Sequence, residues 1–157
     1  MSEQAVRGRT VVVGVDGSPA AQAALHWAIE YARAVGAEVV AVHAYEGVVT
    51  FSDPYGAAMP TMLDPELCRS GVRQSFEEDW CGQLASAGVP SRKVLADGPA
   101  AGVVLDVAER EAADLVVTGR RGLNVLGELV LGSVSRDLVH HSKRPVVLVP
   151  GGHQVAA

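Results

Sequence analysis

Short aliphatic segments alternate with helix-like segments along the chain, and this alternation constrains the fold more than any other feature. Residues 10–16 read TVVVGVD, residues 38–44 read EVVAVHA and residues 145–149 read PVVLV. Continuous aliphatic runs of this kind are typical of parallel strands that are buried on both faces. Shorter runs at 93–96 and 114–118 complete a set of five expected strands.

Helical patterns fill the intervals between these strands. The first, over residues 18–36, has a serine N-cap and a first-turn proline at its start and a glycine at its end. Apolar residues recur every fourth position over 65–87, and further helices are expected over 98–112 and 133–141. Repeated β-α-β units imply right-handed crossovers, so we expect an open α/β fold with a mostly parallel sheet and helices on both faces.

The chain of 157 residues fits one domain over residues 1–157, with a core at about 9–150. Only 4% of the residues are aromatic, so the core is expected to consist mainly of Val, Leu and Ala. Residues 45–64 show no sustained period and are punctuated by glycine and proline. A loop of this length in a compact domain is usually functional or mobile.

Composition excludes several classes of protein. The formal net charge is −5 and there is no block of Lys and Arg, which argues against sequence-independent binding of nucleic acid. The N-terminus lacks the apolar core of a signal peptide, and no apolar run approaches the roughly 18 residues that span a bilayer. Cys68 and Cys81 fall in one expected helix, about 20 Å apart, too far for a disulfide. We therefore expect a cytoplasmic protein with free thiols and no membrane association.

Two strand ends carry unusual residues. In open α/β sheets, ligands bind beyond the carboxyl ends of the strands, where the strand order reverses. The first expected strand runs into GVDGS at 14–18, which places the carboxylate of Asp16 at this rim. The fourth is followed by GRRGLNVLGELVLGSVS, over residues 119–135. Gly119 and Gly122 allow positive φ and a close approach of the backbone to a ligand.

The last expected helix begins just after Gly132. Its unpaired N–H groups and its dipole favour an anion, Ser133 and Ser135 add hydroxyl donors, and Arg120 and Arg121 add positive charge. Together these features describe a polyphosphate site. An alternative also fits, in which the glycines are ordinary turn residues and Ser133 is only an N-cap. Neither GxxxxGK[ST] nor GxGxxG is present.

The spacing Gly119-x2-Gly122-x9-Gly132-Ser133 resembles the G-x2-G-x9-G-[ST] motif of the ATP-binding universal stress proteins. The resemblance covers nearly the whole chain. It includes the first turn, the His at the end of the second strand, the Gly-Pro start of the third helix, and the closing LGSVSRDLV…RPVVLVP. It implies a Rossmann-like fold of the adenine nucleotide α-hydrolase type, with strand order 3-2-1-4-5 and the reversal between strands one and four.

The resemblance also implies roles for individual residues. Asp16 would lie near the ribose or a bound Mg²⁺. Arg120, at a position that is commonly small or polar in the family, is expected to strengthen phosphate binding. The complete expected set is Gly14, Val15 and Asp16 beside the nucleoside, Ala44 at adenine, Gly119, Arg120 and Gly122 along the phosphates, and Gly132, Ser133, Val134 and Ser135 around the phosphate tail.

The expected function is that of an ATP-binding stress-response regulator. No nucleophile can be assigned, and the phosphate segment supplies no obvious base to activate water, so any ATP hydrolysis should be slow. Two alternatives remain open at this point: a nucleotide-using enzyme of a related α-hydrolase or ligase type, and a stress protein that acts through protein contacts without ATP. A lone His at a buried strand end, His43, is expected to be a hydrogen-bonded core residue.

A homodimer through the fifth strand is also expected. In the implied strand order this strand lies at a sheet edge, and Val146–Val149 contains no charge or proline to protect that edge. The resemblance points the same way, because members of the family commonly dimerise through this strand.

Overall fold

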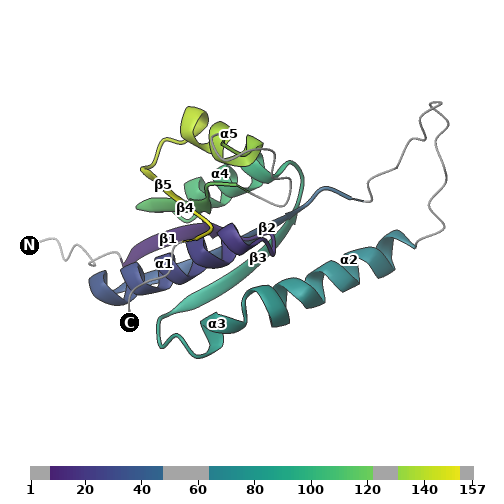
Figure 1. The fold of residues 1–157 in the computed structure, drawn as a ribbon, viewed down its shortest axis with the longest axis horizontal. Coiled ribbons are helices and arrows are strands. Elements are labelled where there is room, and N and C mark those ends of the chain that lie inside the picture. The colour runs from purple at the N-terminus through teal and green to yellow at the C-terminus, as the bar shows by residue number, and fades with distance from the viewer. Residues whose placement is uncertain (1–7, 48–63, 122–130, 153–157) are drawn as a thin grey trace, which may run out of the picture.

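The computed structural model describes residues 8–47, 64–121 and 131–152. At its centre is a five-stranded parallel sheet in the order β3-β2-β1-β4-β5 (Figure 1). Its strands are β1 (Arg9–Gly14), β2 (Ala37–Tyr45), β3 (Ser91–Asp97), β4 (Leu115–Gly119) and β5 (Val146–Val149). The expected fold class and strand order are confirmed, and β3 and β5 form the two edges.

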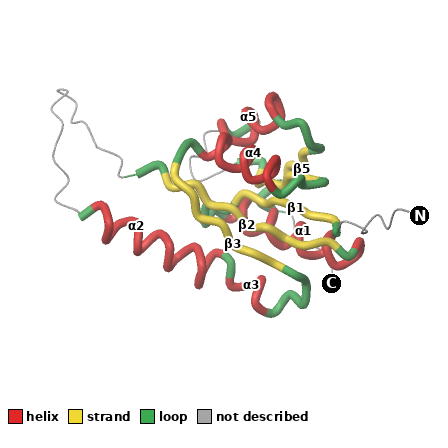
Figure 2. Tube along the Cα trace, turned by 180° about the vertical axis from the view of Figure 1, so that it is seen from behind, coloured by secondary structure: helices red, strands yellow, loops and turns green. Residues whose placement is uncertain are grey.

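Helices cover both faces of the sheet (Figures 1 and 2). On one face, α1 packs with the segment that ends in α3, and on the other α4 packs with α5. The first helix residue of α2 follows Asp64, whose carboxylate accepts from the N–H of Glu66. The helical elements are α1 (Pro19–Val35), α2 (Pro65–Gln74), the π-helical η1 (Ser75–Trp80), α3 (Gly82–Ala85), α4 (Ala100–Arg110) and α5 (Ser133–His141).

Alternation along β1 divides the core into two layers. Val11 and Val13 pack with α1, η1 and α3, whereas Val12 packs with α4 and α5. Successive side chains of a strand point to opposite faces, so a strand that is apolar at every position must be covered on both sides. The continuous aliphatic runs therefore have the structural consequence expected from the sequence.

The expected single helix over 65–87 is wrong in one respect, because a π-helical turn interrupts it. The N–H of Cys81 donates to the carbonyl oxygen of Phe76 at 3.1 Å, five residues back. Apolar residues recur here every fourth position, a longer period than the 3.6 residues of an α-helical turn. With a period of four, the apolar stripe of an α-helix would turn gradually away from the sheet. The wider π turn corrects this, and both Phe76 and Cys81 are fully buried against the sheet.

Strand ends differ slightly from the sequence expectation. β1 ends at Gly14 rather than Asp16, although the N–H of Val15 still donates to the carbonyl oxygen of Val42. Both cysteines are free, as expected. In the part of the chain that the structure describes, no helix is long and apolar enough to cross a membrane.

Candidate functional site

The turn between β1 and α1 is held by its own side chains. The carboxylate of Asp16 accepts from the N–H of Ser18 at 2.9 Å, and the hydroxyl of Ser18 accepts from the N–H of Ala21 at 3.1 Å. Gly17, between them, has a φ of 79°, a conformation that glycine adopts without a steric cost. This local network fixes Asp16 at the carboxyl end of β1, beside the start of α1.

His43 supports the same turn from β2. Its Nδ1 lies 2.7 Å from the carbonyl oxygen of Val15. A carbonyl oxygen only accepts, so Nδ1 carries the hydrogen and donates it. The half-buried imidazole also packs edge-on against the indole of Trp80, with 4.9 Å between ring centroids. The expected hydrogen bond of His43 is confirmed, although the side chain is half-buried rather than part of the core.

Gly119, the last residue of β4, lies directly against α1. A Cβ at this position would stand 2.7 Å from the carbonyl carbon and 2.8 Å from the Cβ of Ala20. Gly119 does not adopt the positive φ that a glycine allows. A glycine is required because α1 approaches the backbone so closely at this position. This contact brings the start of α1, which follows β1, against the end of β4.

The start of α5 is bonded to the same strand end. The hydroxyl of Ser135 donates to the carbonyl oxygen of Gly119 at 2.7 Å and lies 3.0 Å from that of Arg120. The N–H of Gly132 donates to the carbonyl oxygen of Arg120 at 3.1 Å. The N–H of Arg120 in turn donates to the carbonyl oxygen of Val149 at 2.8 Å. Hydrogen bonds therefore join residues 119–120 to the first turn of α5 as one unit.

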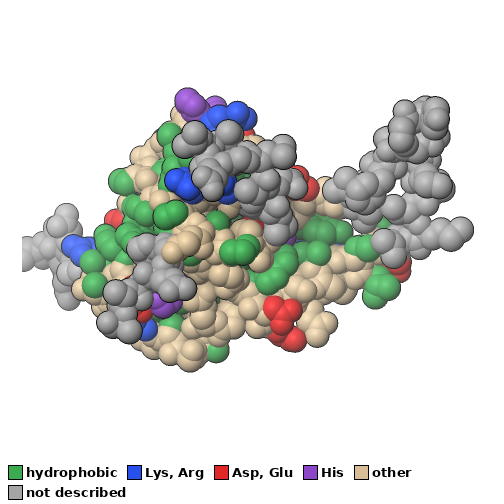
Figure 3. Space-filling model, viewed as in Figure 1, with side chains coloured by type: hydrophobic (Ala, Val, Ile, Leu, Met, Phe, Trp, Pro, Cys, Tyr) green, Lys and Arg blue, Asp and Glu red, His purple; other side chains and the backbone are tan. Residues whose placement is uncertain are grey.

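This unit presents an uncapped helix N-terminus. Gly132 is the N-cap of α5 and has no side chain to accept from the first turn, and no other capping side chain is found within the described ranges. No described residue accepts from the N–H groups of Ser133, Val134 and Ser135, which point toward a position where the helix dipole favours an anion. Ser133 and Arg120 are exposed, and basic side chains are visible over the α4–α5 layer in Figure 3.

The structure places the described residues of the expected set at the carboxyl ends of the strands. Gly14, Val15, Asp16 and Ala44 lie at the ends of β1 and β2, and Gly119, Arg120 and residues 132–135 lie at the end of β4 and the start of α5. Gly122 lies outside the described residues. Among those that are described, no group of three His, Cys, Asp or Glu residues could hold a metal ion by itself.

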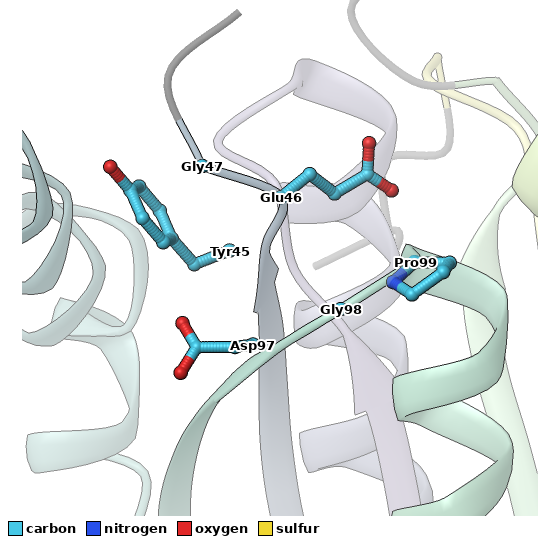
Figure 4. Close-up of a pocket in the computed structure, with 6 residues that line it drawn as sticks. All are labelled: Tyr45, Glu46, Gly47, Asp97, Gly98 and Pro99. Atoms are coloured by element: carbon cyan, nitrogen blue, oxygen red, sulfur yellow. The ribbon is translucent and has the colours of Figure 1, made fainter. Parts of the chain in front are cut away.

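A cavity of about 520 Å³ at the ends of β2 and β3 was not expected from the sequence (Figure 4). The carboxylate of Glu46 reaches the start of α4 and accepts from the N–H of Ala100 at 2.9 Å. Arg69 pairs with Asp97, and its guanidinium lies 5.5 Å from the ring centre of Tyr45. The sequence contained a signal for this cavity, because polar residues stand at the ends of both neighbouring strands. The lining residues are Tyr45, Glu46, Gly47, Asp97, Gly98 and Pro99.

Comparison with known sequences decides the family. The sequence model of the universal stress protein family matches residues 8–150. The chain belongs to the universal stress protein family. A universal stress protein of Thermus aquaticus is 36% identical over 145 residues, which cover 90% of this chain and 98% of the relative. One from Mycolicibacterium smegmatis is 33% identical over 150 residues, covering 93% of this chain and 49% of the relative, so the chain spans about half of that longer universal stress protein.

Solved universal stress proteins share the fold. One in complex with cAMP is 24% identical with a TM-score of 0.68, and the match covers 93% of this chain and 99% of that one. The Archaeoglobus fulgidus protein in complex with dAMP is 21% identical with a TM-score of 0.65, covering 92% and 99%. An Arabidopsis thaliana member with AMP bound is 20% identical with a TM-score of 0.61, covering 90% and 91%.

Proposed function

We propose that this universal stress protein binds ATP at the carboxyl edge of its sheet and acts as a nucleotide-dependent regulator of a stress response. The observation that carries the proposal is the uncapped first turn of α5, held against the end of β4 by Ser135 and lying beside Arg120. A helix N-terminus of this kind, fixed in place before the ligand arrives, is suited to a phosphate chain.

The nucleoside would lie toward β1 and β2. Asp16 stands at the end of β1, and Ala44 offers backbone groups near the end of β2. Three universal stress proteins of the same fold hold cAMP, dAMP or AMP, which supports an adenine nucleotide as the ligand class. The triphosphate and the family motif, including Gly122, belong to the proposal and rest on the spacing of the sequence.

Magnesium would accompany the triphosphate. Mg²⁺ in nucleotide sites is usually held by one or two carboxylates, by phosphate oxygens and by water. The carboxylate of Asp16 fits this donor set at the edge where the phosphates would lie. Because positioning without an activated nucleophile supplies only part of the barrier reduction, we expect at most slow hydrolysis of bound ATP.

One substitution separates a phosphate site from an ordinary helix start. Ser133→Asp places a carboxylate in the first turn of α5, where the dipole stabilises it by about 0.5 kcal/mol. The same charge repels a phosphate, so calorimetry should show at least about a tenfold loss of ATP affinity without a loss of stability. The control is Ser133→Asn. Asn is nearly isosteric with Asp but neutral, so this variant should bind ATP within a few-fold of the wild type. Equal affinity of Ser133→Asp and Ser133→Asn would refute the proposed site.

A further inference from the structure

The indole of Trp80 lies against the turn that follows β1. A Cβ at Gly17 would stand 2.6 Å from Cε2 and 2.7 Å from Nε1 of the indole. No side chain fits between the backbone of the turn and the ring. Trp80 belongs to η1, about sixty residues further along the chain, and the π-helical turn helps to bring this segment against the sheet.

Trp80 is itself fixed from two directions. Its carbonyl oxygen accepts from Nε2 of Gln22, in α1, at 3.0 Å. Its ring meets the imidazole of His43 at an interplanar angle of 78°, and His43 donates to the carbonyl oxygen of Val15. The indole and the imidazole therefore hold the backbone at Gly17 and at Val15, the two neighbours of Asp16.

We propose that Trp80 is a positioning residue of the nucleotide site, which holds the turn at Asp16 and Gly17 in the conformation that receives the nucleoside. The inference rests on the proposed function and adds a residue that lies outside the glycine motif. The hydrogen bonds of Asp16, Ser18 and His43 restrain the two sides of the turn. Gly17 lies between them with a positive φ and no side chain, so the packing of the indole is what restrains its backbone. Without the indole, binding would have to order the turn, and that entropic cost lowers affinity.

The chain contains two tryptophans, which provides a matched control. Trp27, in α1, stacks on Tyr31 with 5.3 Å between ring centroids and is also half-buried. Trp27→Phe leaves Trp80 as the sole indole fluorophore, and Trp80→Phe leaves Trp27. The emission of Trp80 should change on addition of ATP and saturate with the calorimetric Kd, whereas the emission of Trp27 should not change.

Affinity provides the second readout. Trp80→Leu should weaken ATP binding by about tenfold, and Trp80→Phe should recover part of that loss because an aromatic ring still packs on Gly17. Trp27→Leu removes a similar apolar area and should leave the affinity unchanged. If wild type and Trp80→Leu bind ATP equally, or if Trp80 emission does not respond, the inference is overturned while the proposed function stands. If the wild type binds no ATP, both are overturned.

Discussion

The hydroxyl of Ser135 donates to the carbonyl oxygen of Gly119 at 2.7 Å, which joins the first turn of α5 to the end of β4. Ser135 is buried, so its hydroxyl serves the protein and only its backbone N–H remains for a ligand. A helix N-terminus can bind an anion well only when it is held in one place, and this hydrogen bond holds it.

Ser135→Ala tests this relationship. The change removes the buried hydrogen bond from the Ser135 hydroxyl to the carbonyl oxygen of Gly119, so we expect a loss of about 1–2 kcal/mol in the free energy of unfolding and a several-fold loss of ATP affinity. Ser142→Ala is the control, because the Ser142 hydroxyl donates to a carbonyl oxygen at the other end of α5. The control should lose stability but keep its ATP affinity. A Ser135→Ala variant with unchanged affinity would show that the bond is only structural.

Gly119→Ala should destabilise the protein by about 1–3 kcal/mol, because the new methyl group would collide with the backbone of Ala20. Gly102→Ala is the comparison, since Gly102 lies on the exposed side of α4 with open space around it. Gly102→Ala should raise the free energy of unfolding of the protein by about 0.5–1 kcal/mol. Denaturant unfolding measures both, and equal effects would contradict the packing described for Gly119.

The two cysteines should differ in reactivity. Burial raises the pKa of the Cys81 thiol to about 11, so at pH 8 only about a thousandth of it is thiolate. Cys68 is partly exposed. Iodoacetamide at pH 8 should therefore alkylate Cys68 in the native protein and Cys81 only after unfolding. Rapid labelling of a native Cys68→Ser variant would contradict the burial of Cys81.

Arg92 joins two acidic residues on the surface. It donates to the carboxylates of Glu38 and Glu111, each at 2.6 Å, and its hydrogen bond holds the pKa of Glu111 below the ordinary value of 4.5. A carboxyl group with a depressed folded-state pKa adds stability above its unfolded pKa and loses it as the pH falls through the folded value.

The free energy of unfolding should therefore fall more steeply in the wild type than in Glu111→Gln when the pH drops from about 5 to about 3. Because the groups are exposed, the difference should stay below about 1 kcal/mol and shrink in high salt. Parallel pH profiles of the two proteins would remove the role assigned to this ion pair.

The sheet edge at β5 supports a further proposal, a homodimer. Val146 to Leu148 are only half-buried in the single chain, and the strand contains no charge. Light scattering at micromolar concentration should give about twice the chain mass of 16.3 kDa. Val147→Lys should shift the protein toward monomer while ATP binding remains. A wild type that stays monomeric at high concentration would refute the dimer.

Much of the fold could be predicted because its signals are local. Aliphatic runs, a serine cap followed by proline, and terminal glycines locate β1, β2 and α1 to within about two residues. The start of α5 was predicted at Ser133, where it lies in the structure. The strand order followed from the family resemblance rather than from local pattern.

The remaining features depend on contacts between distant residues. Nothing near Gly17 in sequence indicates that Trp80 packs on it, and nothing near Gly119 indicates that Ala20 does. The π-helical turn at Ser75–Trp80 resolves a conflict between the period of the sequence and the geometry of an α-helix, and this conflict appears only when Phe76 and Cys81 are both buried in the core. Tertiary contacts also explain why the hydroxyl of Ser135, predicted from the motif as a donor to the ligand, donates to the strand end, while its backbone N–H remains part of the predicted site.

The central claim is that an adenine nucleotide with a phosphate chain binds at the carboxyl ends of the neighbouring strands β1 and β4. Its most direct test is mass spectrometry of the supernatant after the purified protein is denatured, together with calorimetric titration of the nucleotide-free protein with ATP and Mg²⁺. The account predicts that an adenine nucleotide is released and that ATP rebinds with saturable heat. A supernatant without nucleotide, from a folded protein that gives no heat with millimolar ATP, would contradict it.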